Sequence, residues 1–316
     1  MLSAGLRALC VKKRTVEPVG TADAELHHAG RLRARRAIAR PGRPLTLDMK
    51  RINGTPFQTK ALPQKRGLPL RGDDGRQYFA KSTECPNVRS SRNPTWVANE
   101  LIYYLIAQRS GLPMPRSCLI EYQTSLYFGS EYIPGRDAIR QNEAYGNRRL
   151  DEICTNHPAE AESICRALLL DLALLNSDRK PWNILVDSNS SLKTLYFFDH
   201  DKALLGDGKD NGDLWRIRLN YPLLEKSHDY LACSGANRVV ASRLSDQEVF
   251  GIFNSLKLDS SVFPDVRSLC PPEWLSSSLL EELFKFLERW WSSLRKKFHE
   301  DPSYFRTVLG ADERTV

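Results

Sequence analysis

The chain has 316 residues, 41% of them hydrophobic and 27% charged, so it is long enough and apolar enough to bury a substantial core. Its formal net charge of +8 lies almost entirely in the first 50 residues, which hold 11 Lys and Arg against 4 Asp and Glu. The remainder carries 35 basic and 34 acidic residues, so the charge count gives no reason to expect a nucleic-acid partner for the folded part.

Residues 1–48 form the basic segment, with clusters of Lys and Arg at 7–14 and 31–40. Their charge resembles that of a transit peptide, but the segment is poor in serine and lacks a long apolar stretch. We therefore predict a disordered arm, or translated sequence upstream of a start at Met49. Organelle targeting and contact with nucleic acid or membrane are the alternatives.

The seven cysteines are scattered and include no CxxC pair, which argues against a disulfide framework and against a zinc site. A reducing compartment suits such a pattern, and we expect a cytoplasmic protein. No run of 18 apolar residues occurs, so no membrane-spanning helix is expected. The most apolar stretch, residues 167–175, is interrupted by Asp171.

Residues 49–135 are predicted to form a mixed β/α unit, in which glycines separate short segments as they do in hairpins. A helix is expected over residues 95–111, because Val97, Leu101 and Leu105 lie along one side and a Gly and a Pro follow. Strands are expected at residues 77–81, 118–122 and 126–133.

Residues 136–316 are predicted to form a second, mostly helical unit. Leucines at helical spacing indicate a helix over residues 160–175, and a strongly amphipathic helix is indicated over residues 276–298. We expect the second of these to pack on the domain, with binding to a membrane surface as the alternative. Two short strands, at 183–187 and 194–199, are expected between the helices.

A polar loop with kinase-type spacing follows the helix over 160–175. Asp178 and Asn183 match the D-x-x-x-x-N spacing of a kinase catalytic loop, and Asp199 ends the second of the two strands that follow. Adjacent strands would place Asn183 and Asp199 side by side, where their oxygen atoms suit Mg²⁺. Asp178 would then be the carboxylate beside the attacking hydroxyl group.

Phosphate transfer also needs a cation on the nucleotide phosphates. Lys81 ends a predicted strand and Glu100 lies on the next helix, so an ion pair between them would aim the lysine at the phosphates. Glu84 and Glu121 are competing partners for the lysine. In simpler interpretations, Lys81 is a solvated strand end and Glu100 a solvated helix residue.

Some neighbouring features carry weaker signals. The acids at 178 and 199 have an alternative interpretation as turn residues, and Asn183 as the start of a strand. His200 is expected to serve in packing or hydrogen bonding rather than as a base. No clean G-x-G-x-x-G occurs, so the loop that covers the phosphates has two candidates, residues 53–58, which we prefer, and residues 72–75.

At these motifs the chain resembles the HipA-like kinases, within the wider protein-kinase-like superfamily. The matching segments are residues 78–81, 99–101, 111–115, 129–132, 176–185, 198–204 and 272–275. The resemblance implies an α+β, two-lobed protein-kinase-like fold, with a small β-rich N-lobe over 49–135 and a larger helical C-lobe over 136–316. ATP would bind between the lobes, with adenine at a hinge over residues 128–132 that includes Glu131 and Tyr132.

The resemblance also implies roles for the other site residues. Asp178 would be the catalytic base, and Asn183 and Asp199 the ligands of Mg²⁺. Lys81, supported by Glu100, would bind the nucleotide phosphates. All of these residues belong to one ATP-binding site.

We therefore predict an ATP- and Mg²⁺-dependent kinase that phosphorylates a protein Ser or Thr. Full HipA toxins act on a protein serine and pair with a DNA-binding antitoxin, so the resemblance raises an antitoxin-like partner, although we expect this chain to lack their extra N-terminal domain. Two alternatives stay open. One is a kinase of a small molecule or lipid, suggested by the Asp-Arg pair, and the other is a nucleotide-binding pseudokinase or regulatory module.

Overall fold

The computed structural model describes part of the chain in detail. The described residues are 49–57, 67–83, 95–133, 136–138, 143–176, 179–180, 183–187, 194–204, 240 and 242–305. They all belong to one compact unit, Leu47–Val316. The basic segment 1–48, for which we predict a disordered arm, lies outside the described residues.

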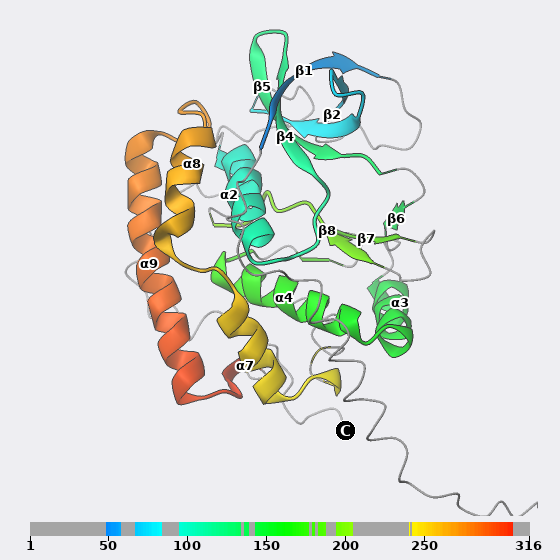
Figure 1. Ribbon diagram of the computed structural model, residues 1–316, viewed down its shortest axis with the longest axis vertical. Helices are drawn as coiled ribbons and strands as arrows, with labels where there is room; N and C mark the ends of the chain where they lie inside the picture. The colour runs from blue at the N-terminus through cyan, green and yellow to red at the C-terminus, as the bar shows by residue number, and fades with distance from the viewer. Residues whose placement is uncertain are drawn as a thin grey trace, which may run out of the picture. The chain divides into compact units, whose positions relative to one another are not determined.

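Five strands form a closed barrel in the order β1-β2-β3-β5-β4 (Figure 1). Their bounds are Arg51–Pro56 for β1, Leu68–Gly72 for β2, Gln77–Lys81 for β3, Ser117–Tyr122 for β4 and Ser125–Glu131 for β5. Neighbouring strands are antiparallel, except that β1 and β4 pair in parallel and close the barrel. Leu70, Tyr78 and Ile120 fill the interior. Gly129 lies so close to Ile120 that a Cβ atom there would collide with it.

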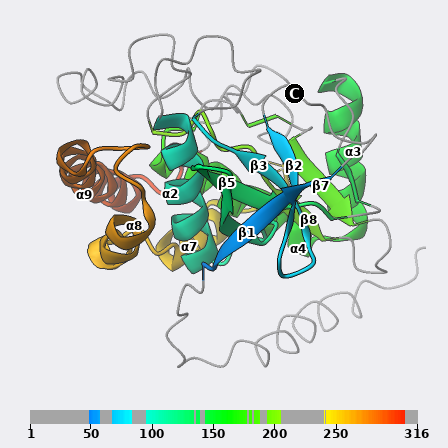
Figure 2. The same ribbon diagram turned by 90° about the horizontal axis from the view of Figure 1, so that it is seen from above.

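Helix α2, Thr95–Arg109, connects β3 to β4 and is the predicted helix of this region. Twelve of its 15 residues are buried, so the helix is apolar around most of its circumference rather than along one side. Figure 2 shows the reason, since the barrel strands lie on one side of α2 and α8 and α9 on the other. This burial fixes α2 against both parts of the fold.

The remaining elements are mostly helical. They are β6 Arg136–Ala138, α3 Glu143–Asn156, α4 Ala159–Ala173, β7 Ile184–Asp187, β8 Leu195–Phe197, α7 Asp246–Ser255, a short 3-10 helix Ser260–Val262, α8 Phe263–Leu269 and α9 Ser277–Glu300. The three strands form a small antiparallel sheet in the order β6-β7-β8. The α+β class is therefore confirmed, and the predicted helices and strands of this region are present, with the addition of β6, α3, α7, the 3-10 helix and α8.

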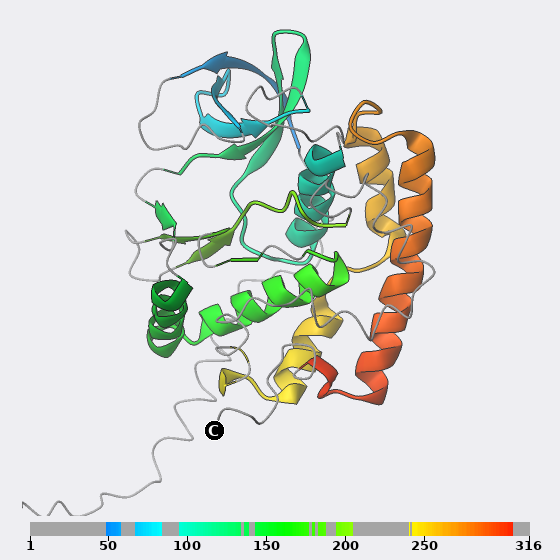
Figure 3. The same cartoon turned by 180° about the vertical axis from the view of Figure 1, so that it is seen from behind.

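Helix α9 packs against α4, as Figure 3 shows from behind. Its start is capped by Ser276, whose hydroxyl accepts from the Leu279 N–H at 3.4 Å. The indole N–H groups of Trp290 and Trp291 donate to the backbone oxygens of Leu172 and Ala173, at 3.3 and 3.1 Å. The last carbonyl groups of a helix have no partner within it, so these two bonds hold the end of α4 where the polar loop begins.

The described helices include none that is long and apolar enough to cross a membrane. Among the described cysteines, Cys118, Cys154, Cys165 and Cys270 are free thiols. All four are buried, so they contribute to the core as small apolar residues.

The packing of α9 can be tested at Leu283, whose side chain is 0% exposed. Replacing Leu283 by Ala removes buried methyl groups and leaves a cavity, so the free energy of unfolding should fall by about 2–5 kcal/mol in urea denaturation. Ser292→Ala, on the exposed side of the same helix, should change it by less than about 0.5 kcal/mol. Equal losses in the two variants would contradict the packing described here.

Candidate active site

Lys81, the last residue of β3, lies at the centre of the candidate site and is only 6% exposed. Its Nζ forms an ion pair with Glu100 on α2 and lies 2.6 Å from Oδ1 of Asp199. Oδ2 of Asp201 lies 3.6 Å from the same nitrogen. The predicted ion pair between Lys81 and Glu100 is therefore present, and the lysine joins the barrel to α2 and to the segment after β8.

Glu100 is the partner that the fold selects for the lysine. One carboxylate oxygen accepts from Lys81, and the other accepts from the backbone N–H of His200 at 3.0 Å. The competing Glu121 pairs instead with Arg51 on the surface of the barrel. Glu84 lies outside the described residues.

Three carboxylates thus meet around one lysine. One ligand oxygen from each of Glu100, Asp199 and Asp201 lies within 4.8 Å of the others. Burial by itself would lower the pKa of Lys81, but Asp199, Glu100 and Asp201 raise that pKa well above its usual range, so the lysine stays charged. Burial raises the pKa of Glu100, Lys81 opposes this, and the two aspartates raise it further. A set of carboxylate oxygens fits a hard divalent cation, whose charge would balance the cluster.

Asp201 was not among the predicted site residues. The signal was present, because Asp201 follows Asp199 by two residues in the Asp-His-Asp run at the end of the second strand. The side chain is 5% exposed, and the backbone oxygen of Asp201 accepts from Nδ2 of Asn99 on α2 at 2.8 Å. Asp201 therefore belongs to the same cluster as the predicted residues.

Asp199 has a left-handed backbone conformation, with φ of 61°. Such a conformation costs a non-glycine residue free energy and persists where the surroundings impose it. Here the residues on either side of Asp199 are both hydrogen-bonded. The Phe198 N–H donates to the Asn183 backbone oxygen, and the His200 N–H donates to the Glu100 carboxylate. The carboxylate of Asp199 is turned toward Lys81 while its side chain stays 32% exposed, so a ligand can reach it.

Asn183 directly precedes β7 and is 3% exposed. In the register of β7 and β8, Ile184 faces Phe197, and the Phe198 N–H donates to the Asn183 oxygen at 3.2 Å. The backbone of Asn183 thus lies across from the residue before Asp199. The two strands bring Asn183 and Asp199 to the same end of the small sheet, as predicted. Their role as metal ligands stays a prediction.

Asp178, the predicted base, lies outside the described residues. Asn176 and Arg179, which flank it in the sequence, both donate hydrogen bonds to the carboxylate of Asp171 on α4. Asn176 Nδ2 donates to Asp171 Oδ1 at 2.7 Å, and Arg179 donates to both carboxylate oxygens at 2.8 and 2.9 Å. Asp171 is the residue that interrupts the most apolar stretch of the sequence, and this interruption was the only sequence signal for the buried ion pair.

His200 is 1% exposed and stacks on Tyr103, with ring centroids 3.7 Å apart. Its Nδ1 accepts from Arg179 Nη2 at 2.8 Å, which leaves the proton of the neutral ring on Nε2. Burial lowers the pKa of His200 well below its usual value, and the positive charges of Arg179 and Lys81 lower it further. The expectation that His200 serves in packing and hydrogen bonding is confirmed.

Glu131 and Tyr132 lie away from the lysine cluster. Glu131 faces Tyr78 on β3, three residues before Lys81, which corresponds to about 10 Å along a strand. The Glu131 N–H donates to the Arg116 oxygen at 2.8 Å, and the Tyr132 N–H donates to the Gln77 oxygen at 2.7 Å. An adenine ring would therefore have to use other backbone groups of this segment, and its binding there stays a prediction.

The strand register places the two candidates for the phosphate-covering loop on the barrel. The preferred candidate, residues 53–58, is largely strand, because residues up to Pro56 belong to β1. The other, residues 72–75, is the turn between β2 and β3, about 16 Å along β3 from Lys81. Leu68 faces Ala80, so the connection from β1 into β2 is the one at the lysine end of the barrel. Most of that connection, residues 58–66, lies outside the described residues.

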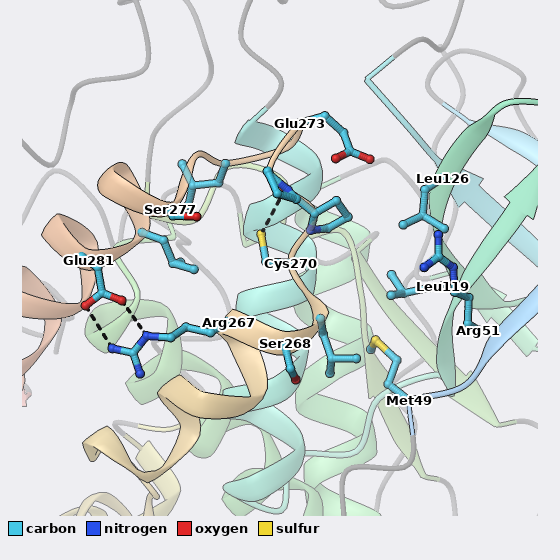
Figure 4. Close-up of a pocket in the computed structure, with 15 residues that line it drawn as sticks. Met49, Arg51, Leu119, Leu126, Arg267, Ser268, Cys270, Glu273, Ser277 and Glu281 are labelled. Carbon is cyan, nitrogen blue, oxygen red and sulfur yellow. Dashed lines mark hydrogen bonds and ion pairs between the residues drawn. The ribbon is translucent and has the colours of Figure 1, made fainter.

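A pocket of about 500 Å³ lies elsewhere, between the barrel and the turn from α8 to α9 (Figure 4). Met49 and Leu119 line it from the barrel, and Cys270 and Leu280 from the helices. Its rim includes an arginine and a glutamate that pair with each other, Arg267 and Glu281. No member of the Lys81 cluster lines this pocket, so the two sites are separate.

A strand lysine held by a helix glutamate, beside two aspartates that follow a β-hairpin, resembles the arrangement found in protein kinases. Residues 68–214 match the sequence model of a family described as HipA-like kinase. This match confirms the resemblance to HipA-like kinases that the motifs indicated. A search of curated proteins gives no match.

Solved structures give fold likenesses at low identity. The Helicobacter pylori proinflammatory kinase CtkA is 12% identical with a TM-score of 0.46, over 84% of this chain and 99% of that one. HipA of Shewanella oneidensis, solved with HipB and operator DNA, is 10% identical with a TM-score of 0.38, over 89% of this chain and 72% of that one. At these values neither structure assigns an activity to this chain.

Because His200 is buried and neutral, it makes the free energy of unfolding depend on pH. The folded pKa of His200 lies below its unfolded value of about 6.5, so the unfolded state binds a proton that the folded state does not. The contribution of His200 to the free energy of unfolding should therefore fall below pH 6.5, by up to about 1.4 kcal/mol per pH unit, and hold steady above it. His200→Asn, which keeps an acceptor near Nδ1, should lack this loss.

The measurement is urea denaturation of both proteins at pH 7.5, 6.5 and 5.5. The shift at Glu100 is present in both proteins and cancels in the difference between them. The advantage of the wild type over the variant should shrink between pH 6.5 and 5.5. Parallel pH curves would mean that His200 does not stay neutral in the folded protein.

Proposed function

We propose that the chain is an ATP- and Mg²⁺-dependent kinase that transfers the γ-phosphoryl group to a Ser or Thr hydroxyl group of a protein. The observation that carries this proposal is the Lys81 cluster, in which one charged lysine, a helix glutamate and two aspartates meet at the end of a barrel. Phosphoryl transfer depends mainly on such charge arrangement and on positioning. In this proposal the barrel belongs to an N-lobe over 49–135, and the helical elements to a C-lobe over 136–316.

The proposed roles follow from the positions of the side chains. Lys81 would bind the nucleotide phosphates, and Glu100, which also accepts from the His200 N–H, would keep its amine in place. Asn183 and Asp199 would hold Mg²⁺, which when bound would neutralise charge on the phosphate oxygens. Asp178 would accept the proton of the attacking hydroxyl group.

The nucleotide would lie along β3. Adenine would meet the segment of Glu131 and Tyr132, and the phosphates would reach Lys81 about three residues further along the strand. The connection between β1 and β2 would cover the phosphates, since the register places it at that end.

The acceptor and the partners are proposed from the family resemblance. A protein Ser or Thr is the first candidate, and a small molecule or lipid headgroup is the second. A pseudokinase is less well supported, because Lys81 forms the ion pair with Glu100 that an active kinase requires and Asp199 lies beside the lysine. A cytoplasmic location rests on the cysteine pattern, and an antitoxin-like partner stays a prediction.

Magnesium binding can be tested at Asp199. In a thermal-shift assay ATP with Mg²⁺ should stabilise the wild type, by about 2.7 kcal/mol when ATP is at 100 times its dissociation constant. Asp199→Ala should lose the magnesium-dependent part of this stabilisation. Glu288→Ala, which removes an exposed acid on α9, should retain it in full. An undiminished magnesium effect in the Asp199 variant would show that Asp199 is not a ligand.

Phosphate transfer can be tested at Asp178 with labelled ATP and a generic protein acceptor. Asp178→Ala should lower the rate of transfer by about 10²-fold or more, because a general base is removed, while binding of ATP with Mg²⁺ persists. Equal labelling by wild type and variant would refute the role of Asp178. Transfer only to soluble small molecules or lipids would favour the second candidate, and binding without any transfer would favour the pseudokinase.

A further inference from the structure

The guanidinium group of Arg179 contacts three separate parts of the fold, although the residue is only 3% exposed. Its Nε and Nη2 donate to the two carboxylate oxygens of Asp171 on α4, at 2.8 and 2.9 Å. Nη2 also donates to His200 Nδ1 at 2.8 Å and to the Tyr103 hydroxyl on α2 at 3.3 Å. Nη1 donates to the Phe198 oxygen at 3.3 Å. One side chain therefore joins α4, α2 and the segment that follows β8.

The backbone around Phe198 connects this arginine to both proposed metal ligands. The N–H of Phe198 donates to the oxygen of Asn183, and its carbonyl group accepts from Arg179. Asp199 is the next residue in the chain. The loop that carries Arg179 and ends at Asn183 and the segment that carries Asp199 are therefore linked twice, once through each side of Phe198.

The other end of the loop is fixed to the same carboxylate. Asn176 Nδ2 donates to Asp171 Oδ1, and the Asn176 N–H donates to the Asp171 backbone oxygen, both within 2.8 Å. Tyr103 adds a fourth side-chain group, since its hydroxyl donates to Asp171 Oδ1 at 2.8 Å. Asp171 thus accepts from Asn176, Tyr103 and Arg179, and its two contacts with the guanidinium group fix the orientation of Arg179.

A buried ion pair by itself adds little net stability compared with apolar residues of similar size, because both charges lose their hydration. Stability alone is therefore a weak reason for Arg179 and Asp171 to lie inside this core. What a guanidinium group provides is a planar set of donors that reaches several acceptors at fixed angles, which lysine cannot reproduce. Phe198 and His200, on either side of Asp199, are two of those acceptors.

We propose that Arg179 is a positioning residue that sets the separation between Asn183 and Asp199, and thereby the affinity of the site for Mg²⁺. This inference rests on the proposed function, in which those two residues hold the ion. Arg179 acts through Phe198 and His200 and does not itself contact the nucleotide. The supporting groups of a metal site commonly contribute 10–100-fold to metal affinity or activity.

The test is a magnesium titration of the full chain at fixed ATP, read as thermal stabilisation. Arg179→Lys keeps the charge but loses most of the directed bonds, so the magnesium concentration for half-maximal effect should rise by about 10–100-fold. Arg166→Lys is the matched control. Arg166 lies on α4 and donates to the Ser110 oxygen at 2.9 Å and to Ser255 Oγ at 2.8 Å. It should leave the magnesium constant unchanged even where it lowers the melting temperature.

Tyr103→Phe keeps the proposal testable where Arg179→Lys does not fold, because it removes only one hydroxyl group from the network. It should raise the magnesium constant by about 3-fold or more, because the hydroxyl group donates to the Asp171 carboxylate and accepts from Arg179. A wild-type magnesium constant in the folded variant of Arg179 or Tyr103, with only the melting temperature lowered, would overturn the positioning role. So would an equal rise in the Arg166 variant.

The wild-type titration separates this inference from the function on which it rests. If the wild type shows no magnesium-dependent effect of ATP, the proposed function itself fails, and the role of Arg179 falls with it. If the wild type responds to magnesium and the variants respond identically, only the positioning role fails.

Discussion

The meeting of Lys81 with Glu100, Asp199 and Asp201 is the interaction on which the arrangement of the site depends. The lysine comes from the barrel, the glutamate from α2, and the aspartates from the segment after β8. Burying these groups costs hydration free energy that only close contact can offset. The cluster therefore constrains the barrel, α2 and the small sheet together, since a shift of any of them would leave a buried charge without its partner.

The helical part of the fold extends this constraint to the polar loop. Trp290 and Trp291 of α9 hold the last carbonyl groups of α4, and Asp171 on α4 holds the loop through Asn176 and Arg179. A helix nearly 150 residues further along the chain than the barrel thus contributes to the position of the loop. Packing and site geometry are linked here through hydrogen bonds to backbone groups that α4 itself cannot satisfy.

The sequence predicted the elements whose signals are local. Helical leucine spacing located α4 and α9, and the order of strand, helix and polar loop indicated the pair of Lys81 and Glu100. The failures have a common physical cause. The role of Asp201 and the choice of phosphate-covering loop depend on strand register and on contacts between distant segments, which periodicity does not encode. Asp171 was visible only as a charge in an apolar helix, and its partner Arg179 could not be chosen before the fold placed them together.

Helix α2 shows why the site is assembled before any ligand binds. Its middle is tied to the segment after β8, because Asn99 donates to the Asp201 oxygen and Glu100 accepts from the His200 N–H. Its end is tied to α8 and the turn before it, where Arg109 pairs with Asp265 and donates to Ser261. A movement of α2 large enough to separate Glu100 from Lys81 would break all of these bonds and expose a helix that is buried on most sides. The lysine is therefore held in place beside Glu100 by the packing of α2.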